Sequence, residues 1–383
     1  MTGTVGVPER RVVLHVGTMK SGTTSIQSLL FSQQSVLADR GVLALGNRWF
    51  AQVKGVRELI VHPDAPGRPW QKLVDQAREW DGTSVISMEF LGPFIPRRIE
   101  AAVASFGDLP VHVVLTMRDL NRTIPSLWQE AIQNGRSWSW TDYRSGTRDA
   151  RPWQAAPPAE VTEPGRTFWR QQDAYRIVRR WAAAVGGERV SLVTLPPPGA
   201  PRHTLIERFG HAVGFAADDL VVTEPKNAAL GAASAQMLQR VNARLAELGL
   251  ADSDAPNVRK SLLAKQVLSA RRAQEQGIGL EVHPWVVETA DQMVERLKAS
   301  GVHLVGEWTD LAPVAARGVD PEDTPGSELV AAAKDGFDGL RELLEGQHRT
   351  ATLPQWPGPS DPKGAIEALA ALVRAGASRE DAA

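Results

Sequence analysis

The residues best suited to chemistry lie close together near the start of the chain. A mostly apolar run, Val12–Val16, leads into a short segment bounded by Gly17 and Gly22. Within and just after this segment stand Lys20 and the hydroxyl residues Ser21, Thr23 and Thr24. Because a lysine supplies positive charge and hydroxyls donate hydrogen bonds, these residue types favour binding of an anion.

The residues after the second glycine predict a helix that begins at about Thr23. Its apolar residues recur at helical spacing, at Ile26, Leu29, Leu30 and Leu37. The first backbone N–H groups of a helix have no partner within the helix, and the helix dipole adds partial positive charge there. A strand, a glycine loop and a helix N-terminus in this order therefore predict a phosphate-binding loop.

The position of the lysine separates two classes of phosphate-binding loop. In the loop that binds nucleoside triphosphates, the lysine directly follows the second glycine. Here Thr23 follows that glycine and Lys20 lies inside the loop. This segment resembles the loop with which sulfotransferases hold 3′-phosphoadenosine 5′-phosphosulfate (PAPS). The resemblance implies that the cosubstrate is bound by these residues: Gly17, Lys20, Ser21, Gly22, Thr23 and Thr24.

A second candidate anion site follows the predicted strand Val111–Met117. Arg118 ends this strand and Ser126 lies eight positions later. Sulfotransferases hold the 3′-phosphate of PAPS with an arginine and a serine at this spacing. Pro125 suits the first position of a helix, which would place Ser126 among free amides, and an arginine can bind the same anion through two hydrogen bonds. The alternative is that Arg118 pairs with Asp119 and that the serine only caps a helix.

Three further segments are similar to a bacterial branch of PAPS-dependent sulfotransferases. They are Phe168–Asp173, Thr194–Gly199 and Asn227–Gly231. The resemblance covers about residues 10–250, with weaker likeness to about residue 315. The Arg-Lys-Gly element with which well-known cytosolic members bind the 3′-phosphate is absent. Lys226 is the nearest basic residue that could take that role.

The resemblance implies in-line transfer of a sulfuryl group to the hydroxyl or amine of an acceptor, which could be a small molecule, a lipid-linked molecule or a glycan. Lys20 would stabilise the negative charge that develops on the bridging oxygen. Glu89 follows the predicted strand Thr83–Met88, and it is the predicted general base because some family members use a glutamate. The alternative is a surface carboxylate that pairs with Arg97 or Arg98.

Other residue types give no second catalytic centre. The reaction needs no metal, and the eight histidines are scattered without metal-ligand spacing. His15 lies within a predicted strand and is expected to be a core histidine. The tryptophans at positions 128, 138, 140, 153 and 169 could line an acceptor site or pack onto the sheet. Two other functions stay open, namely a kinase or NTPase that uses Mg-ATP and a nucleotide-binding module without catalysis.

The elements that would position these residues predict an α/β fold, a doubly wound parallel sheet of the P-loop-like kind. Five strand-like runs alternate with helical segments: 11–16, 41–45, 83–88, 111–117 and 189–195. Ligands bind beyond the carboxyl ends of such strands, where the glycine loop, Glu89 and Arg118 all lie. Beyond residue 227 the chain is predicted to be mainly helical.

Composition bounds the remaining choices. The chain has 383 residues, 43% of them apolar, and a net charge of −1, which gives no general attraction to nucleic acid or acidic membranes. The lack of cysteine excludes disulfides and thiolate catalysis. No apolar run reaches the length of a membrane span, and we expect a cytoplasmic protein. The oligomeric state is left open.

The organisation predicted from these patterns has four parts. Residues 1–10 form a disordered lead-in, and residues 11–250 form the α/β core, with an irregular insertion at 136–167. Residues 251–348 form a helical extension that packs on the core. Residues 349–383 are a proline-rich linker and a loose helix.

Overall fold

The computed structural model describes residues 9–154, 160–201, 203–221, 229–346 and 353–380. Its internal contacts divide the chain into two units whose segments alternate along the sequence. Unit 1 comprises Met1–Leu120, Thr167–Pro225 and Pro284–Pro313. Unit 2 comprises Asn121–Arg166, Lys226–His283 and Val314–Ala383. The predicted core of residues 11–250 therefore contributes to both units.

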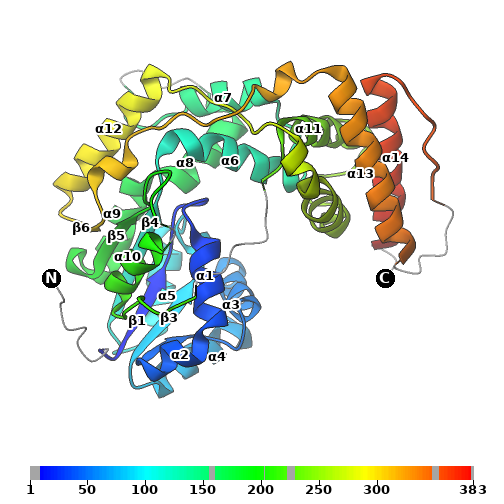
Figure 1. The fold of residues 1–383 in the computed structure, drawn as a ribbon. Helices are drawn as coiled ribbons and strands as arrows, with labels where there is room; N and C mark the ends of the chain where they lie inside the picture. The colour runs from blue at the N-terminus through cyan, green and yellow to red at the C-terminus, as the bar shows by residue number, and fades with distance from the viewer. Residues whose placement is uncertain (1–8, 155–159, 202, 222–228, 347–352, 381–383) are drawn as a thin grey trace. The chain divides into compact units, whose positions relative to one another are not determined.

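Unit 1 is built on a six-stranded sheet in which all neighbouring strands run parallel (Figure 1). The strands are β1 (Arg11–His15), β2 (Val42–Ala44), β3 (Thr83–Ser87), β4 (Val111–Met117), β5 (Val190–Thr194) and β6 (His303–Val305). Their order is β2-β3-β1-β4-β5-β6, so β1 lies between β3 and β4. The predicted fold class is confirmed.

The strands form where the sequence has short, apolar, β-branched runs. In β1 and β4 both faces are buried, as expected for a parallel sheet covered by helices. The five predicted strands are present. The sixth, β6, was missed because it has only three residues and begins with the exposed His303, so it shows no clear pattern.

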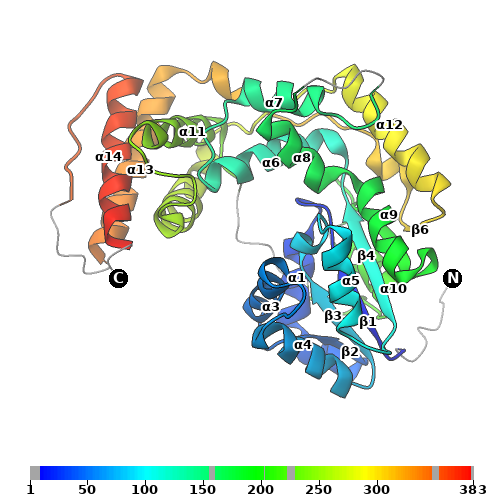
Figure 2. The ribbon, with the colours of Figure 1, turned by 180° about the vertical axis from the view of Figure 1, so that it is seen from behind.

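Helices cover both faces of the sheet. One face shares an apolar core with α1 (Thr23–Ser32), α2 (Gln34–Asp39) and α10 (Thr204–Val213). On the strands this core includes Val13 and Val85. In the opposite view, α5 (Pro96–Ala104) and α9 (Ala174–Val185) lie in front of the sheet (Figure 2), and α9 contacts β4, β5 and α5. The sheet is therefore doubly wound.

Three further helices complete unit 1: α3 (Trp49–Val61), α4 (Arg68–Glu79) and α12 (Pro284–Ala299). Single turns occur at η1 (Glu89–Leu91), η2 (Gly187–Arg189) and η5 (Trp308–Leu311). The sequence analysis missed α3, because the buried face of this helix includes Gln52 and Gly55 in place of large apolar residues. Without them the helical spacing of apolar residues is weak.

Unit 2 is helical. Its elements are α6 (Leu120–Gln133), α7 (Trp140–Asp149), α11 (Ala232–Glu247), the π-helix η3 (Asn257–Val267), η4 (Leu268–Gln274), η6 (Pro321–Asp323), α13 (Gly326–Gly346) and α14 (Pro362–Glu380). Helix α8 (Glu163–Gln172) begins in unit 2 and ends in unit 1. Expected as a loose helix, α14 instead packs against α11 and α13 and buries Leu369 and Leu372 completely.

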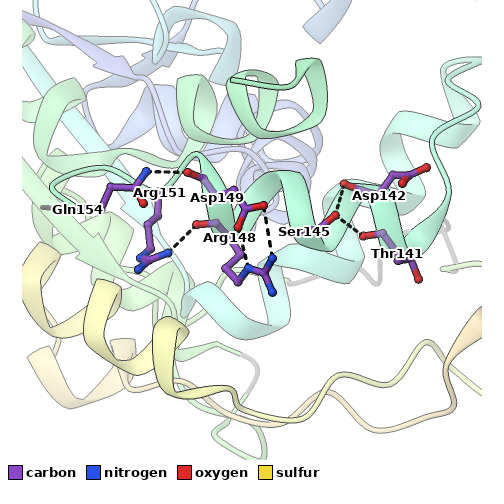
Figure 3. Close-up of polar contacts among 7 residues, drawn as sticks. All are labelled: Thr141, Asp142, Ser145, Arg148, Asp149, Arg151 and Gln154. Carbon is purple, nitrogen blue, oxygen red and sulfur yellow. Dashed lines mark hydrogen bonds and ion pairs between the residues drawn. The ribbon is translucent and has the colours of Figure 1, made fainter. Parts of the chain in front are cut away.

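The segment 136–167 is not irregular throughout, because it contains α7. Ser139 caps this helix by accepting a hydrogen bond from the backbone N–H of Asp142. Figure 3 shows short-range contacts along the helix, such as the Ser145 hydroxyl donating to the Thr141 carbonyl at 2.8 Å. Arg148 likewise contacts the neighbouring carboxylate at 2.8 Å. These contacts are satisfied within one helix and its ends, so they give no ligand site.

Two of the tryptophans considered for an acceptor site belong to the apolar core of unit 2. Trp128 and Trp140 are completely buried, with ring centroids 5.2 Å apart. The indole N–H of Trp128 donates to the Trp138 carbonyl at 3.0 Å. These side chains therefore support packing within unit 2.

A buried ion pair holds the carboxyl end of β5 to the segment after β6. The Arg208 guanidinium donates to the Asp310 carboxylate at 2.7 Å and to the Thr194 carbonyl at 2.9 Å. The Thr194 hydroxyl donates to the same carboxylate at 2.6 Å. Asp310 thus has two side-chain partners in addition to the backbone N–H of Glu307.

No helix among the described residues is long and apolar enough to cross a membrane.

Replacing Arg208 by methionine should lower the free energy of unfolding by about 3–5 kcal/mol, because it leaves a buried carboxylate without its cation. Urea denaturation measures this. The control is Arg97→Met, which removes a pair with Asp64 whose side chains are both largely exposed and should change stability by less than about 1 kcal/mol. Equal effects of the two substitutions would contradict the assignment of the Arg208 pair.

Candidate functional site

The glycine loop connects β1 to α1 at the carboxyl edge of the sheet. Gly22 adopts a left-handed conformation with φ of 81°, and a Cβ atom there would lie 2.5 Å from Leu205 of α10. At Gly17, with φ of 30°, a Cβ atom would lie 2.9 Å from the Thr116 hydroxyl. The backbone conformation therefore favours glycine at both positions, and at Gly17 the buried neighbours also leave little space for a side chain. Lys20 is also left-handed, with φ of 66°, which is uncommon for a residue with a side chain.

The end of the loop at the start of α1 leaves backbone amides without a side-chain cap. At the start of α1, Gly22 provides no side-chain cap, so the first amides of the helix receive no help from the residue that precedes them. Thr24 is exposed there, whereas Thr23 is buried. The arrangement keeps the expected strand, loop and helix N-terminus and makes it a suitable place for an anion.

Ser21, which is predicted to bind the cosubstrate, uses its hydroxyl in contacts within the protein. It is completely buried, and its hydroxyl donates to the Thr18 carbonyl at 2.5 Å. The same oxygen lies 2.7 Å from the Thr116 hydroxyl on β4. Ser21 thus closes the loop and fastens it to the sheet. Its predicted part in binding the cosubstrate stays a prediction.

The His15 imidazole connects Thr116, which holds the glycine loop, to Ser87 on the neighbouring strand β3. Its Nε2 lies 3.0 Å from the Thr116 hydroxyl, and its Nδ1 lies 2.7 Å from the Ser87 hydroxyl at the end of β3. The ring packs against Phe209, with centroids 5.0 Å apart. Complete burial lowers the pKa of His15 from 6.5 to about 3, so the imidazole is neutral at physiological pH. These contacts agree with the predicted core histidine.

Two glutamines that the sequence analysis did not single out as site residues hold the surroundings of the loop. Gln172, at the end of α8, donates to the Met19 carbonyl at 2.9 Å. Gln27, on α1, donates to the Ser87 carbonyl at 3.1 Å and to the Glu89 carboxylate at 2.9 Å. None of these three hydrogen bonds has a local sequence signal, because the partners are separated by 153, 60 and 62 residues.

Glu89 lies close to the loop and is held by α1. Its carboxylate accepts from Gln27, which is four residues after Thr23 and therefore on the same face of α1, about 6 Å along its axis. The turn that begins at Glu89 also touches the loop, because a Cβ atom on Gly92 would lie 2.9 Å from the Gly17 carbonyl oxygen. The carboxylate and the helix N-terminus thus belong to one local arrangement.

The alternative partners proposed for Glu89 are engaged elsewhere. Arg97 forms its ion pair with Asp64. The guanidinium of Arg98 lies 6.0 Å from the ring centroid of Phe94. Glu89 is half-buried, and its carboxylate keeps a neutral amide as hydrogen-bond partner.

Arg118 directly follows β4, and a backbone hydrogen bond brings the end of this strand close to the glycine loop. The N–H of Thr18 donates to the Thr116 carbonyl at 2.8 Å, and Arg118 is two residues further on, at most about 7 Å along an extended chain. Its Nε lies 3.8 Å from the Asp119 carboxylate, which is an ion-pair contact too long for a hydrogen bond. Arg118 is partly exposed and Asp119 is buried.

Ser126 is not in the first turn of a helix. Helix α6 begins at Leu120, so Pro125 lies inside it, and the Ser126 hydroxyl donates to the Arg122 carbonyl at 2.9 Å. Pro125 has no backbone N–H, so the helix lacks the hydrogen bond from this residue to the carbonyl four residues earlier. Ser126 belongs to unit 2, whereas Arg118 belongs to unit 1. A role for this serine toward the 3′-phosphate stays a prediction.

The third predicted contact to that phosphate, Lys226, lies outside the described residues. Within the described part of the chain, no group of three or more acidic or histidine side chains could hold a metal ion. Unit 1 brings together the glycine loop, Glu89 and the end of β4 at one edge of the sheet.

The burial of His15 predicts a specific pH dependence of stability. The pKa of His15 is about 3 in the folded protein and 6.5 when unperturbed, so between these values the unfolded chain binds more protons. The free energy of unfolding should therefore fall as the pH is lowered from 6.5 toward 3, by up to about 1.4 kcal/mol per pH unit from this residue. An NMR titration checks it: an imidazole signal of His15 that titrates near pH 6.5 would contradict the prediction.

Comparisons with known proteins give one similarity. No protein-family model matches the chain, and no curated protein matches it. Among solved structures, a crystal structure of a sulfotransferase from Alicyclobacillus acidocaldarius is 14% identical, with a TM-score of 0.37, over 68% of this chain and 98% of that chain. Similarity of this degree establishes neither the family nor the activity of this protein.

Proposed function

We propose that the protein is a sulfotransferase that moves a sulfuryl group from PAPS to a hydroxyl or amine of an acceptor molecule. The observation that carries the proposal is the loop itself. Lys20 stands inside it in a left-handed conformation, and Thr23 occupies the place where a triphosphate-binding loop has its lysine. A loop of this kind favours a phosphosulfate over Mg-ATP.

The chemistry requires a base close to the anion site, and Glu89 meets this requirement. In the reaction, the acceptor oxygen or nitrogen attacks sulfur, the bond from sulfur to the 5′-phosphate oxygen breaks, and the acceptor proton passes to a base. Glu89 is held by Gln27 one helical turn from the N-terminus of α1. A carboxylate in this position can accept the proton, and adenosine 3′,5′-bisphosphate leaves.

The remaining residues have separate tasks in the proposal. Lys20 and the first amides of α1 stabilise charge on the 5′-phosphate side as the bond to sulfur breaks. Arg118 binds the 3′-phosphate, and the roles of Ser126 and Lys226 toward this phosphate stay predictions from the sequence. The acceptor is a small molecule, a lipid-linked molecule or a glycan, and the transfer itself needs no metal ion.

The nucleotide that stabilises the fold most should distinguish a sulfotransferase from a kinase. Adenosine 3′,5′-bisphosphate at about a hundred times its dissociation constant should stabilise the fold by about 2.7 kcal/mol, because it binds only the native state. Thermal denaturation with this nucleotide, with Mg-ATP and with adenosine 5′-monophosphate measures the difference. Stronger stabilisation by Mg-ATP would contradict the proposal.

Substitution of Glu89 by glutamine should lower kcat by about 10²–10⁴-fold and leave nucleotide affinity nearly unchanged, because the amide keeps the shape but cannot accept the proton. Transfer of labelled sulfate from PAPS and calorimetric titration with adenosine 3′,5′-bisphosphate measure the two quantities. The matched control is Glu100→Gln, an exposed carboxylate on α5. Full turnover by the Glu89 variant would place the base elsewhere.

Replacement of Arg118 by alanine should have the opposite pattern and weaken nucleotide binding, by about tenfold or more for the loss of one charged hydrogen bond. The same titration measures it. The control is Arg189→Ala, because Arg189 precedes β5 and lies at the amino edge of the sheet. Unchanged affinity of the Arg118 variant would remove this residue from the nucleotide site.

A further inference from the structure

We propose that His15 is a positioning residue that fixes the glycine loop relative to the end of β3 through a one-way chain of hydrogen bonds. The inference rests on the proposed function, because it gives His15 a task in aligning the donor loop with the base Glu89. His15 itself touches neither substrate. The chain of hydrogen bonds that includes His15 has four other members. They are the hydroxyls of Ser87, Thr116 and Ser21 and the backbone carbonyl of Thr18.

The direction of the chain follows from its last acceptor. A carbonyl can only accept, so the Ser21 hydroxyl must donate to Thr18. The single proton of Ser21 is then used, and the Thr116 hydroxyl must donate to Ser21. For the same reason Thr116 accepts from His15, whose Nε2 must carry the proton, and the bare Nδ1 accepts from the Ser87 hydroxyl. One tautomer of a neutral imidazole satisfies every bond.

Ser87 is the end of the chain that faces the base. Its hydroxyl donates to His15, its backbone N–H donates to Gln52 at 2.9 Å, and its carbonyl accepts from Gln27. The next residue, Met88, donates its N–H to the His15 carbonyl at 2.9 Å. Because every polar group of Ser87 is fixed, the backbone that leads to Glu89, two residues further on, has little freedom.

Thr18 is the end of the chain that faces the anion. Its carbonyl is held inward by Ser21, and its N–H is bound to the Thr116 carbonyl. These two hydrogen bonds therefore close the turn that contains Lys20 and attach it to β4. All five members are at most 1% exposed, so water cannot replace a missing partner from the surface. A break in the chain should then move the loop or the base end and not merely expose a group to solvent.

The proton order can be tested without any assay of activity. In protein labelled with ¹⁵N-histidine, two-bond ¹H–¹⁵N spectra should assign to His15 a protonated Nε2 and an unprotonated Nδ1 at pH 7. The assignment comes from the signal missing in a His15→Gln variant, or from a Ser87→Ala variant that shifts the signal if the first does not fold. The opposite tautomer or a charged ring would overturn the proposal.

The positioning role is tested by two pairs of variants at 25 °C, after thermal denaturation has shown that each variant is folded at this temperature. Thr116→Val removes the central hydroxyl and should weaken binding of adenosine 3′,5′-bisphosphate by about tenfold, whereas Thr116→Ser should restore it to within about threefold of wild type. Ser87→Ala should lower kcat by about tenfold or more with little change in nucleotide affinity, since a small misplacement of a base slows the reaction.

The control for Ser87→Ala lies on the same strand. The Ser84 hydroxyl is buried and has no hydrogen-bond partner, so Ser84→Ala should leave kcat and affinity unchanged. If the Thr116 and Ser87 variants lose only thermal stability, the chain is structural and the positioning role is wrong. If wild-type protein binds no adenosine 3′,5′-bisphosphate, the proposed function and the positioning role both fail, while the spectra still decide the proton order.

Discussion

The arrangement of unit 1 depends on one buried hydroxyl, that of Thr116. It lies 2.7 Å from Ser21 and 3.0 Å from His15, and it occupies the space that a side chain at Gly17 would need. Three adjacent parts of the sheet edge thus meet at one oxygen atom. Such an atom cannot be solvated from outside, because Thr116 is completely buried, so its partners must be present for the fold to be stable.

The geometry of the loop follows from this anchoring. A left-handed residue with a side chain persists only where the surroundings hold it. Lys20 lies within the turn that the Ser21 hydroxyl closes, two residues before Gly22 at the start of α1. From the other side, Gln172 binds the carbonyl of Met19. The loop therefore has its shape before a ligand arrives, which is the condition under which charge stabilisation costs least reorganisation.

The sequence predicted the parts of the fold that have strong local patterns. The β-branched apolar runs gave five strands, and the glycine spacing with the following apolar period gave the loop and α1. The short strand β6 and the helix α3 lack such patterns, since β6 has three residues and α3 buries Gln52. For the site, residue types and strand ends located the loop, Glu89 and Arg118. The residues that hold the loop and Glu89 in place, Gln27, Gln172 and Thr116, were found only in the tertiary structure, because their spacing along the chain does not predict these contacts.

Unit 1 is assembled from three separated stretches of chain, and this has a consequence for the order of folding. The carboxylate that neutralises Arg208 is Asp310, 102 residues later, and β6 joins the sheet from the same late stretch. During synthesis, β5 and α10 must therefore leave the ribosome long before their last partners exist. Until then the edge of β5 is unpaired and Arg208 lacks its counter-ion, so the nascent sheet passes through a period in which association with other chains competes with completion of the domain.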